Sequence, residues 1–244
     1  VKHLVIINAL FFIATFVVAK SGINLTEHLG LFFVKNDLFK PWQFVSTMFM
    51  HANINHILFN MLALWMFGSA VEQMWGRNKF LFFYFSAGIG ASLIYMLANY
   101  LQFQNVYDNL ITAGLSATDI STILETGSYN TSILKHVSQE SMNTFYGIFN
   151  TPAVGASGAI MGLLVAYGMM FPNAELMLLF FPVPVKAKYF IPVLIGLDVF
   201  SGLTGISIFS PNNTAYWAHI GGALIGVLMM LYWKKTQFNK NRWN

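Results

Sequence analysis

The chain of 244 residues contains no cysteine, so it can form no disulfide and offers no thiolate as a metal ligand or nucleophile. Charged residues are also scarce, at 9% of the sequence against about 25% in average soluble domains. The formal net charge of +4 comes from short segments between apolar runs rather than from one basic face. These features exclude a disulfide scaffold or a thiol enzyme, and nucleic acid is not an expected partner.

Hydrophobic residues make up 56% of the chain and gather in six apolar segments, each near the length that a helix needs to cross a bilayer. The predicted spans are residues 3–19, 56–75, 80–100, 155–172, 187–205 and 215–233. The first segment could also be read as a signal peptide, but no clear small-residue cleavage site follows it. We therefore predict an all-α membrane protein in which residues 1–244 form a single membrane domain.

Basic residues favour one orientation of these spans. With six spans, the following basic residues fall on one side of the membrane: Lys2, Arg77, Lys79, Lys186, Lys188, Lys234, Lys235, Lys240 and Arg242. The longer connections on the other side carry most of the acidic residues. The positive-inside rule then predicts that both termini are cytoplasmic.

Two connections on the outer side are long. Residues 20–55 include Trp42 among polar groups, which is typical of a segment that lies partly in the membrane interface. Residues 101–154 form a polar insert, with short helices expected near 116–126 and 132–146. We interpret this insert as a solvated loop that supplies no catalytic residue.

Polar side chains recur at one depth in three of the predicted spans. Ser157 opens the fourth span and His219 lies in the first turns of the sixth. His56 and Asn60 are four residues apart, so they share one helical face at the outer end of the second span. Polar groups within a membrane are costly and usually functional. The pattern therefore indicates a site near the outer face.

These residue types suit peptide hydrolysis. Serine becomes a good nucleophile when a base such as His219 takes its proton, and the same histidine can then protonate the leaving amine. An attacked amide develops a negative oxygen, to which His56, Asn60 and the backbone N–H of Ser157 can donate. Asp198 is the single acid of the fifth span, and we do not expect it to be catalytic.

Each residue also has a simpler explanation. A membrane serine often bonds within its own helix, and a lone histidine is more often a packing or proton-relay residue. His51 and His56 are five residues apart with no acid between them, so no metal site is expected. Small residues four apart suffice to explain close helix packing, at positions 158, 162, 218, 222 and 226. The joint occurrence of serine, histidine and donors favours catalysis.

The chain resembles the rhomboid family of intramembrane serine proteases. Gly155-Ala156-Ser157-Gly158 looks like the family's Gly-x-Ser-Gly motif, and residues 218–226 look like its Ala-His-x-x-Gly-x-x-x-Gly motif. Residues 51–61 are similar to its second-span signature. The resemblance implies a six-transmembrane-helix rhomboid bundle with both termini cytoplasmic and a shortened fourth helix. It also implies a water-filled cavity open to the outside, with lateral substrate entry near the second and fifth spans.

The resemblance also implies the roles of individual residues. Ser157 would be the nucleophile and His219 its base, in a dyad without a carboxylate, while His56, Asn60 and Ser157 would bind the oxyanion. The chain departs from the family at Gln43, where an arginine often follows the tryptophan, and at Met161, where many bacterial members carry a tyrosine. These departures bear on the anchoring of the first outer loop and on the support of His219.

The predicted function is therefore an intramembrane serine endopeptidase that cleaves single-span membrane proteins near the outer face through a Ser-His dyad and an acyl-enzyme. We expect no cofactor; the partners are transmembrane substrates and membrane lipid, and the oligomeric state is left open. The expected location is a bacterial inner (cell) membrane, with the active site opening to the outer side. The alternatives are a non-catalytic rhomboid-like binding protein, which would be expected to lack the serine or the histidine, and a transporter, which would carry more acids or interrupted spans.

Overall fold

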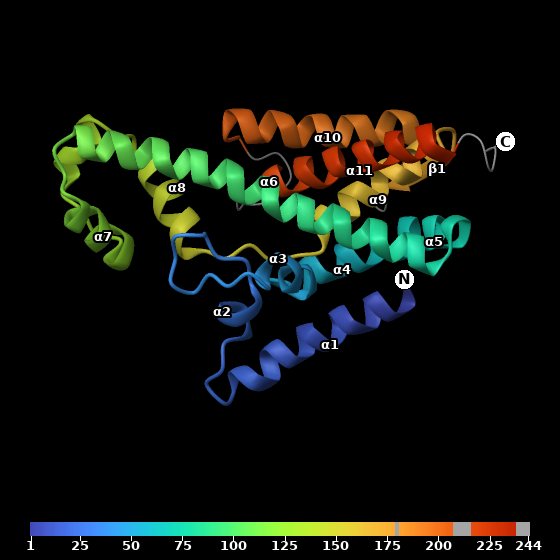
Figure 1. Cartoon of the computed structure of the whole chain (residues 1–244), viewed down its shortest axis with the longest axis horizontal. Helices are drawn as coiled ribbons and strands as arrows, with labels where there is room; N and C mark the ends of the chain where they lie inside the picture. The colour runs from blue at the N-terminus through green and yellow to red at the C-terminus, as the bar shows by residue number, and fades with distance from the viewer. Residues whose placement is uncertain (179–180, 207–215, 238–244) are drawn as a thin grey trace.

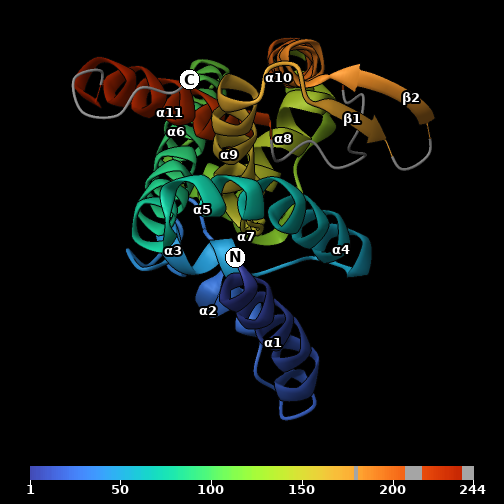
Figure 2. The same ribbon diagram turned by 90° about the vertical axis from the view of Figure 1, so that its right-hand side faces the viewer.

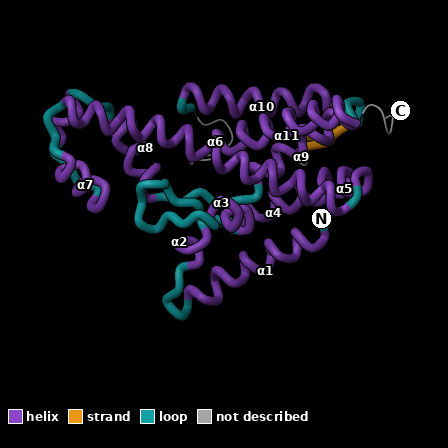
Figure 3. The backbone as a smooth tube through the Cα atoms, in the orientation of Figure 1, coloured by secondary structure: helices purple, strands orange, loops and turns teal. Residues whose placement is uncertain are grey.

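The computed structural model describes residues 1–178, 181–206 and 216–237, most of which are helical (Figures 1 and 3). The membrane helices are α1 (Lys2–Ala19), the run of α4 (Ile54–Ala63), η2 (Leu64–Gly68) and α5 (Ser69–Trp75), α6 (Arg77–Thr112), α9 (Ser157–Met170), α10 (Ala187–Thr204) and α11 (Tyr216–Gln237). The outer connections contain α2 (Leu25–Leu29), α3 (Gln43–Ser46), η1 (Thr47–Phe49), α7 (Ala117–Thr126), η3 (Thr131–Lys135) and α8 (Gln139–Asn150). The predicted all-α fold is confirmed.

The predicted spans correspond to apolar helices. Five of the described helices are long and apolar enough to cross a membrane: α1, the continuous run from α4 to α5, α6, α10 and α11. The remaining predicted span, the fourth, is α9, whose 14 residues rise about 21 Å, less than the roughly 30 Å of a bilayer core. Its short length agrees with the shortened fourth helix that the resemblance implied. The predicted start of the last span, residue 215, lies outside the described residues. The same holds for the basic residues Lys240 and Arg242.

The third predicted span, residues 80–100, lies within α6, and the helix continues beyond that span to Thr112. Beyond residue 100 the sequence is too polar for a span, yet Phe103, Val106 and Leu110 recur at helical spacing and are buried. This amphipathic stretch carries the helix out of the apolar segment without a break, until Gly114 adopts φ +94°.

The interpretation of residues 101–154 as a solvated loop is wrong, because these residues contribute to a hydrophobic core. Its helices α7 and α8 lie beside the far end of α6 and share a hydrophobic core with it (Figure 1). The rings of Phe103 and Phe145 stack with centroids 4.3 Å apart at its centre. The expected helix 116–126 is confirmed as α7, which begins with a capping box between Ser116 and Asp119. The expected helix 132–146 divides into η3 and α8.

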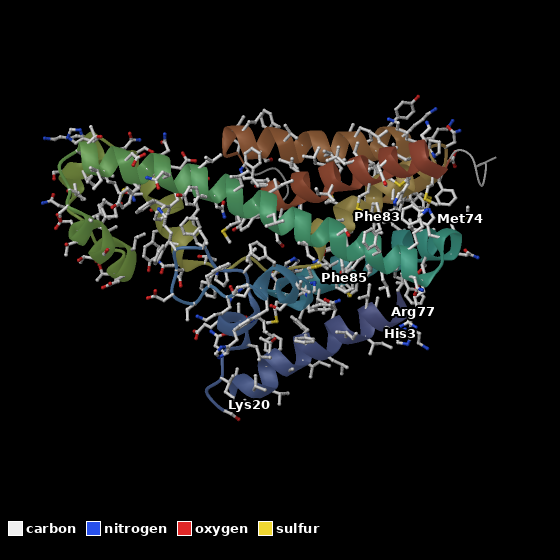
Figure 4. All side chains as sticks on the ribbon, viewed as in Figure 1. His3, Lys20, Met74, Arg77, Phe83 and Phe85 are labelled. Carbon is white, nitrogen blue, oxygen red and sulfur yellow. The ribbon has the colours of Figure 1, made fainter. Side chains whose placement is uncertain are left out.

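A small β-hairpin joins α9 to α10, which the sequence analysis did not predict. Its strands are β1 (Glu175–Leu178) and β2 (Phe181–Lys186), which pair antiparallel. The hairpin, the start of α1 and the end of α11 lie at one end of the bundle (Figure 1). His3 and Arg77 mark the same end, and Lys20 lies at the other end of α1 (Figure 4). This arrangement supports a common side for the basic segments; the membrane side that it faces stays a prediction.

Glycines hold α9 tightly against its neighbours. A Cβ atom placed at Gly222 would overlap the carbonyl oxygen of Gly158, and one at Gly226 would lie 2.9 Å from Cα of Gly162. On the opposite side, a Cβ at Gly158 would lie 2.6 Å from Cβ of Ala91 in α6. Close packing of α9 between α6 and α11 is therefore the reason for these glycines, in agreement with the small-residue spacing.

The first outer loop is anchored by the residue that replaces the family's arginine. Gln43 is fully buried, and its Oε1 accepts hydrogen bonds from the backbone N–H groups of Phe32 (3.2 Å) and Lys40 (3.1 Å). Its Nε2 donates to the carbonyl oxygen of Leu38 (2.8 Å). One uncharged side chain thus satisfies three backbone groups of the loop, so no arginine is needed there.

Candidate active site

A sharp turn of the backbone introduces the predicted nucleophile. Gly155 has φ +130°, a conformation that glycine adopts without strain, and its N–H donates to the carbonyl oxygen of Thr47 (2.9 Å). Two residues later α9 begins at Ser157, as the sequence predicted, and its start has no side-chain cap within the described chain. The first N–H groups of a helix have no partner inside the helix, so they can donate to an anion at this point.

His56 and Asn60 lie against the same turn. A Cβ atom at Gly155 would lie 2.7 Å from Nε2 of His56 and 3.6 Å from Nδ2 of Asn60. Both side chains therefore border the backbone of Gly155, two residues before Ser157. The first turn of α4, which carries His56, is fixed by Asn53, whose side chain accepts from the N–H of His56 (2.9 Å); Asn60 follows one turn later. The two predicted oxyanion donors are thus brought to the loop that holds the predicted nucleophile.

Both side chains offer a hydrogen-bond donor near Gly155. Nδ1 of His56 accepts from the N–H of Ala52 (3.4 Å), so the proton of the neutral ring is on Nε2, the atom that faces Gly155. Nδ2 of Asn60 is buried and has no hydrogen-bond partner among the described residues. An unpaired buried amide costs about 1–3 kcal/mol, and a ligand with a negative oxygen would relieve that cost.

His219 lies in the first turn of α11, a helix that packs on α9. A Cβ atom at Gly158 would lie 3.4 Å from the carbonyl oxygen of Ala218, so the peptide segments 157–158 and 218–219 are neighbours. The glycine contacts farther along α9 and α11 hold this register. Residues from α4, α9 and α11, far apart in sequence, therefore converge on one place at the start of α9.

The structure differs from the expectation that His219 lacks a carboxylate partner. Its Nδ1 lies 3.1 Å from Oδ2 of Asp198, and the two side chains are 23% and 13% exposed. Asp198 belongs to α10 and His219 to α11, two helices that lie side by side (Figure 1). The contact corrects the expectation about the partner of His219, whereas the expectation that Asp198 is not catalytic stays a prediction.

His51 was considered as a metal ligand and not as a neighbour of His56. It is buried, and its ring packs edge-on against the ring of His56, with centroids 5.1 Å apart. Burial, with a smaller contribution from the nearby His56, lowers the pKa of His51 to about 4. His51 is therefore neutral at pH 7 and supports the position of the His56 ring. The five-residue spacing of the two histidines was the feature of the sequence that could have revealed this contact.

Comparisons with known proteins identify the same family as the motifs. The family model for the Rhomboid domain matches residues 38–235. Rhomboid protein 1, mitochondrial, of Saccharomyces cerevisiae is 27% identical over 192 residues, covering 79% of this chain and 42% of that protein. Rhomboid protease AarA of Providencia stuartii is 28% identical over 200 residues (78% and 55%), and RHOMBOID-like protein 12, mitochondrial, of Arabidopsis thaliana is 26% identical over 211 residues (85% and 52%). The chain spans about half the length of these curated relatives.

The predicted location in a bacterial inner membrane is wrong. Relatives from yeast and Arabidopsis are named as mitochondrial, and the same designation recurs in relatives from fission yeast, zebrafish and mouse. These names contradict the bacterial assignment. The charge bias of the connections reports which ends share a side of a membrane, and it carries no information about which membrane that is. The prediction of a multi-pass membrane protein is supported.

Proposed function

Because this chain belongs to the rhomboid family, we propose that it is an intramembrane serine endopeptidase that cleaves single-span membrane proteins. The observation that carries the proposal is the buried amide of Asn60, which has no partner in the part of the chain that the structure describes and lies beside His56 and Gly155, two residues before Ser157. A preorganised donor that is aimed at a nucleophile loop is what an oxyanion site requires. Following the relatives' names, we place the enzyme in a mitochondrial membrane.

The chemistry follows from the positions of these groups. The hydroxyl oxygen of Ser157 bonds to the carbonyl carbon of the substrate, and its proton passes to Nε2 of His219. The carbonyl oxygen becomes negative and accepts hydrogen bonds from His56, Asn60 and the N–H of Ser157.

The C–N bond then breaks as His219 gives the proton to the leaving amine, which leaves an acyl-enzyme on Ser157. Water attacks the ester carbon, His219 takes the proton of that water, and the proton returns to the oxygen of Ser157 as the ester bond breaks.

Substrate access is proposed to be lateral, between α4 and α10. In Figure 2 α9 lies at the centre of the bundle, with α4 and α5 on one side and α10 on the other. A transmembrane substrate must expose a peptide carbonyl, and an intact helix hides its carbonyls in internal hydrogen bonds. We therefore expect cleavage at small or helix-breaking residues, near the face opposite the basic turn at Arg77.

The test uses the purified protein in liposomes together with a single-span substrate. Cleavage should occur with the parent protein and should be lost in Ser157→Ala and in His219→Ala. Ser92→Ala is the matched control, because Ser92 is buried in α6 and has no proposed role, and it should retain activity. Substrate binding without cleavage by the parent would instead support the non-catalytic binding protein.

A further inference from the structure

The proposed dyad does not explain which residue holds the ring of His219 in place. Met161 stands where many bacterial rhomboids have a tyrosine; it is buried in the core, and its thioether is at best a weak hydrogen-bond acceptor. Asp198 instead lies beside the ring, with Oδ2 3.1 Å from Nδ1 of His219. The sequences of α9, α10 and α11 contain no other acid. A carboxylate that is 13% exposed within a membrane helix needs a specific reason to be there.

We infer that Asp198 is a positioning residue of the reaction, which acts through His219 and turns the dyad into a Ser157–His219–Asp198 triad. This inference rests on the proposed function. The carboxylate accepts a hydrogen bond from Nδ1–H of His219, which fixes the tautomer and the plane of the ring. Nε2 is then left without a proton and can accept the proton of Ser157. When that proton arrives, the negative carboxylate stabilises the imidazolium ring.

The effect of Asp198 on catalysis can be tested separately from the packing of α10. α10 contacts the bundle through Ala187, Ile191 and Ser201, which are buried, whereas Asp198 contacts the ring of His219. Replacement of Ser201 thus disturbs the same helix and leaves the carboxylate of Asp198 in place. Asp198→Asn keeps the shape of the side chain but removes the charge and can donate to Nδ1, which favours the wrong tautomer. Asp198→Glu changes the length and keeps the carboxylate.

The experiment measures the rate of fluorophosphonate labelling and the kcat and KM of substrate cleavage for the parent, Asp198→Asn, Asp198→Glu and Ser201→Ala. In soluble triads the matching Asp→Asn change lowers kcat about 10⁴-fold. Here we expect Asp198→Asn to lower the labelling rate and kcat at least about tenfold, with KM changed by less than about twofold, because the carboxylate acts in the transition state. Asp198→Glu should retain more activity than Asp198→Asn, and Ser201→Ala should match the parent.

The relative activities of Asp198→Asn and Asp198→Glu show whether the charge or the shape of the side chain matters. A merely structural carboxylate predicts that the isosteric Asn is tolerated at least as well as Glu, and that order would overturn the inference. Equal labelling rates in the parent and in Asp198→Asn would also overturn it, while leaving Ser157 as the nucleophile. A parent that is never labelled would overturn the proposed function itself.

The hydrogen bond can be checked apart from catalysis in the Ser157→Ala protein labelled with ¹⁵N-histidine. A downfield Nδ1–H proton signal of His219 should be present there, and it should be absent when Asp198→Asn is added. Its persistence in the double variant would refute the contact on which the triad depends.

Discussion

Substitution of Gly222 by alanine should disrupt the site from one helical turn away. A Cβ atom at Gly222 would overlap the carbonyl oxygen of Gly158 and lie 2.7 Å from its carbonyl carbon. Non-bonded carbon atoms rest about 3.5–4.0 Å apart, so α9 and α11 must separate by roughly 1 Å at this contact. Ser157 and His219 are each within one turn of it, and they move apart together with the two helices.

The expected loss follows from that displacement. A misplacement of about 1 Å between reacting groups can lower a rate about 100-fold, and overpacking of a tight interior typically costs about 1–3 kcal/mol. Gly222→Ala should therefore lower both the rate of fluorophosphonate labelling and the Tm in detergent. The matched control is Gly196→Ala in α10, because a Cβ atom there meets no other atom within 4 Å. It should keep the parent's labelling rate.

The reasoning would be refuted by a Gly222→Ala protein that is labelled at the parent rate with an unchanged Tm. Such a result would mean that α9 and α11 do not approach as closely as the glycine contacts require. A fall in Tm without a fall in the labelling rate would show that the two helices separate while Ser157 and His219 stay aligned. That result would contradict only the link from helix separation to loss of labelling.

Three further predictions concern the donors and the loop beside the site. Asn60→Ala should lower kcat about 10²–10³-fold while KM and Tm change little, since the lost amide acts on the transition state; an unchanged kcat would remove it from the oxyanion site. Gln43→Ala should lower the free energy of unfolding by at least about 2 kcal/mol, because buried N–H groups of the first loop lose their acceptor, whereas the exposed Gln102→Ala should change it by less than about 0.5 kcal/mol. Because burial lowers the pKa of His51 to about 4 in the folded protein, the unfolded chain binds the extra proton between about pH 6.5 and pH 4; stability should be highest above this window and fall by up to about 3 kcal/mol as the pH drops through it. Denaturation at several pH values should show this slope for the parent and a weaker slope for His51→Gln, and equal slopes would contradict the assignment.

The membrane helices were predictable because their apolar runs are long and few charges interrupt them. The sequence did not show that the third helix continues beyond its apolar span, because a hydropathy window ends at polar residues. A helix can continue past them where one of its faces is buried. Phe103 and Phe145 belong to such a core, which forms from segments more than 40 residues apart. A hydropathy window cannot detect that pairing, and the small hairpin β1–β2 is too short to leave a clear alternating pattern.

The candidate site was predictable in its members and less so in its contacts. Ser157, His219, His56 and Asn60 stand out because they are polar residues near the ends of apolar segments. The partner of His219 did not stand out, because Asp198 reaches it only through the packing of α10 on α11. Gln43 stands out in the sequence as a departure from the family, but its hydrogen bonds to backbone groups appear only once the loop folds around it.

The most direct test of the account is the site of covalent labelling. The purified protein is treated with a fluorophosphonate, digested and analysed by mass spectrometry. The account predicts one adduct, on the oxygen of Ser157, which disappears in Ser157→Ala and forms more slowly in His219→Ala. An adduct on another serine, or cleavage of a transmembrane substrate by Ser157→Ala, would contradict it.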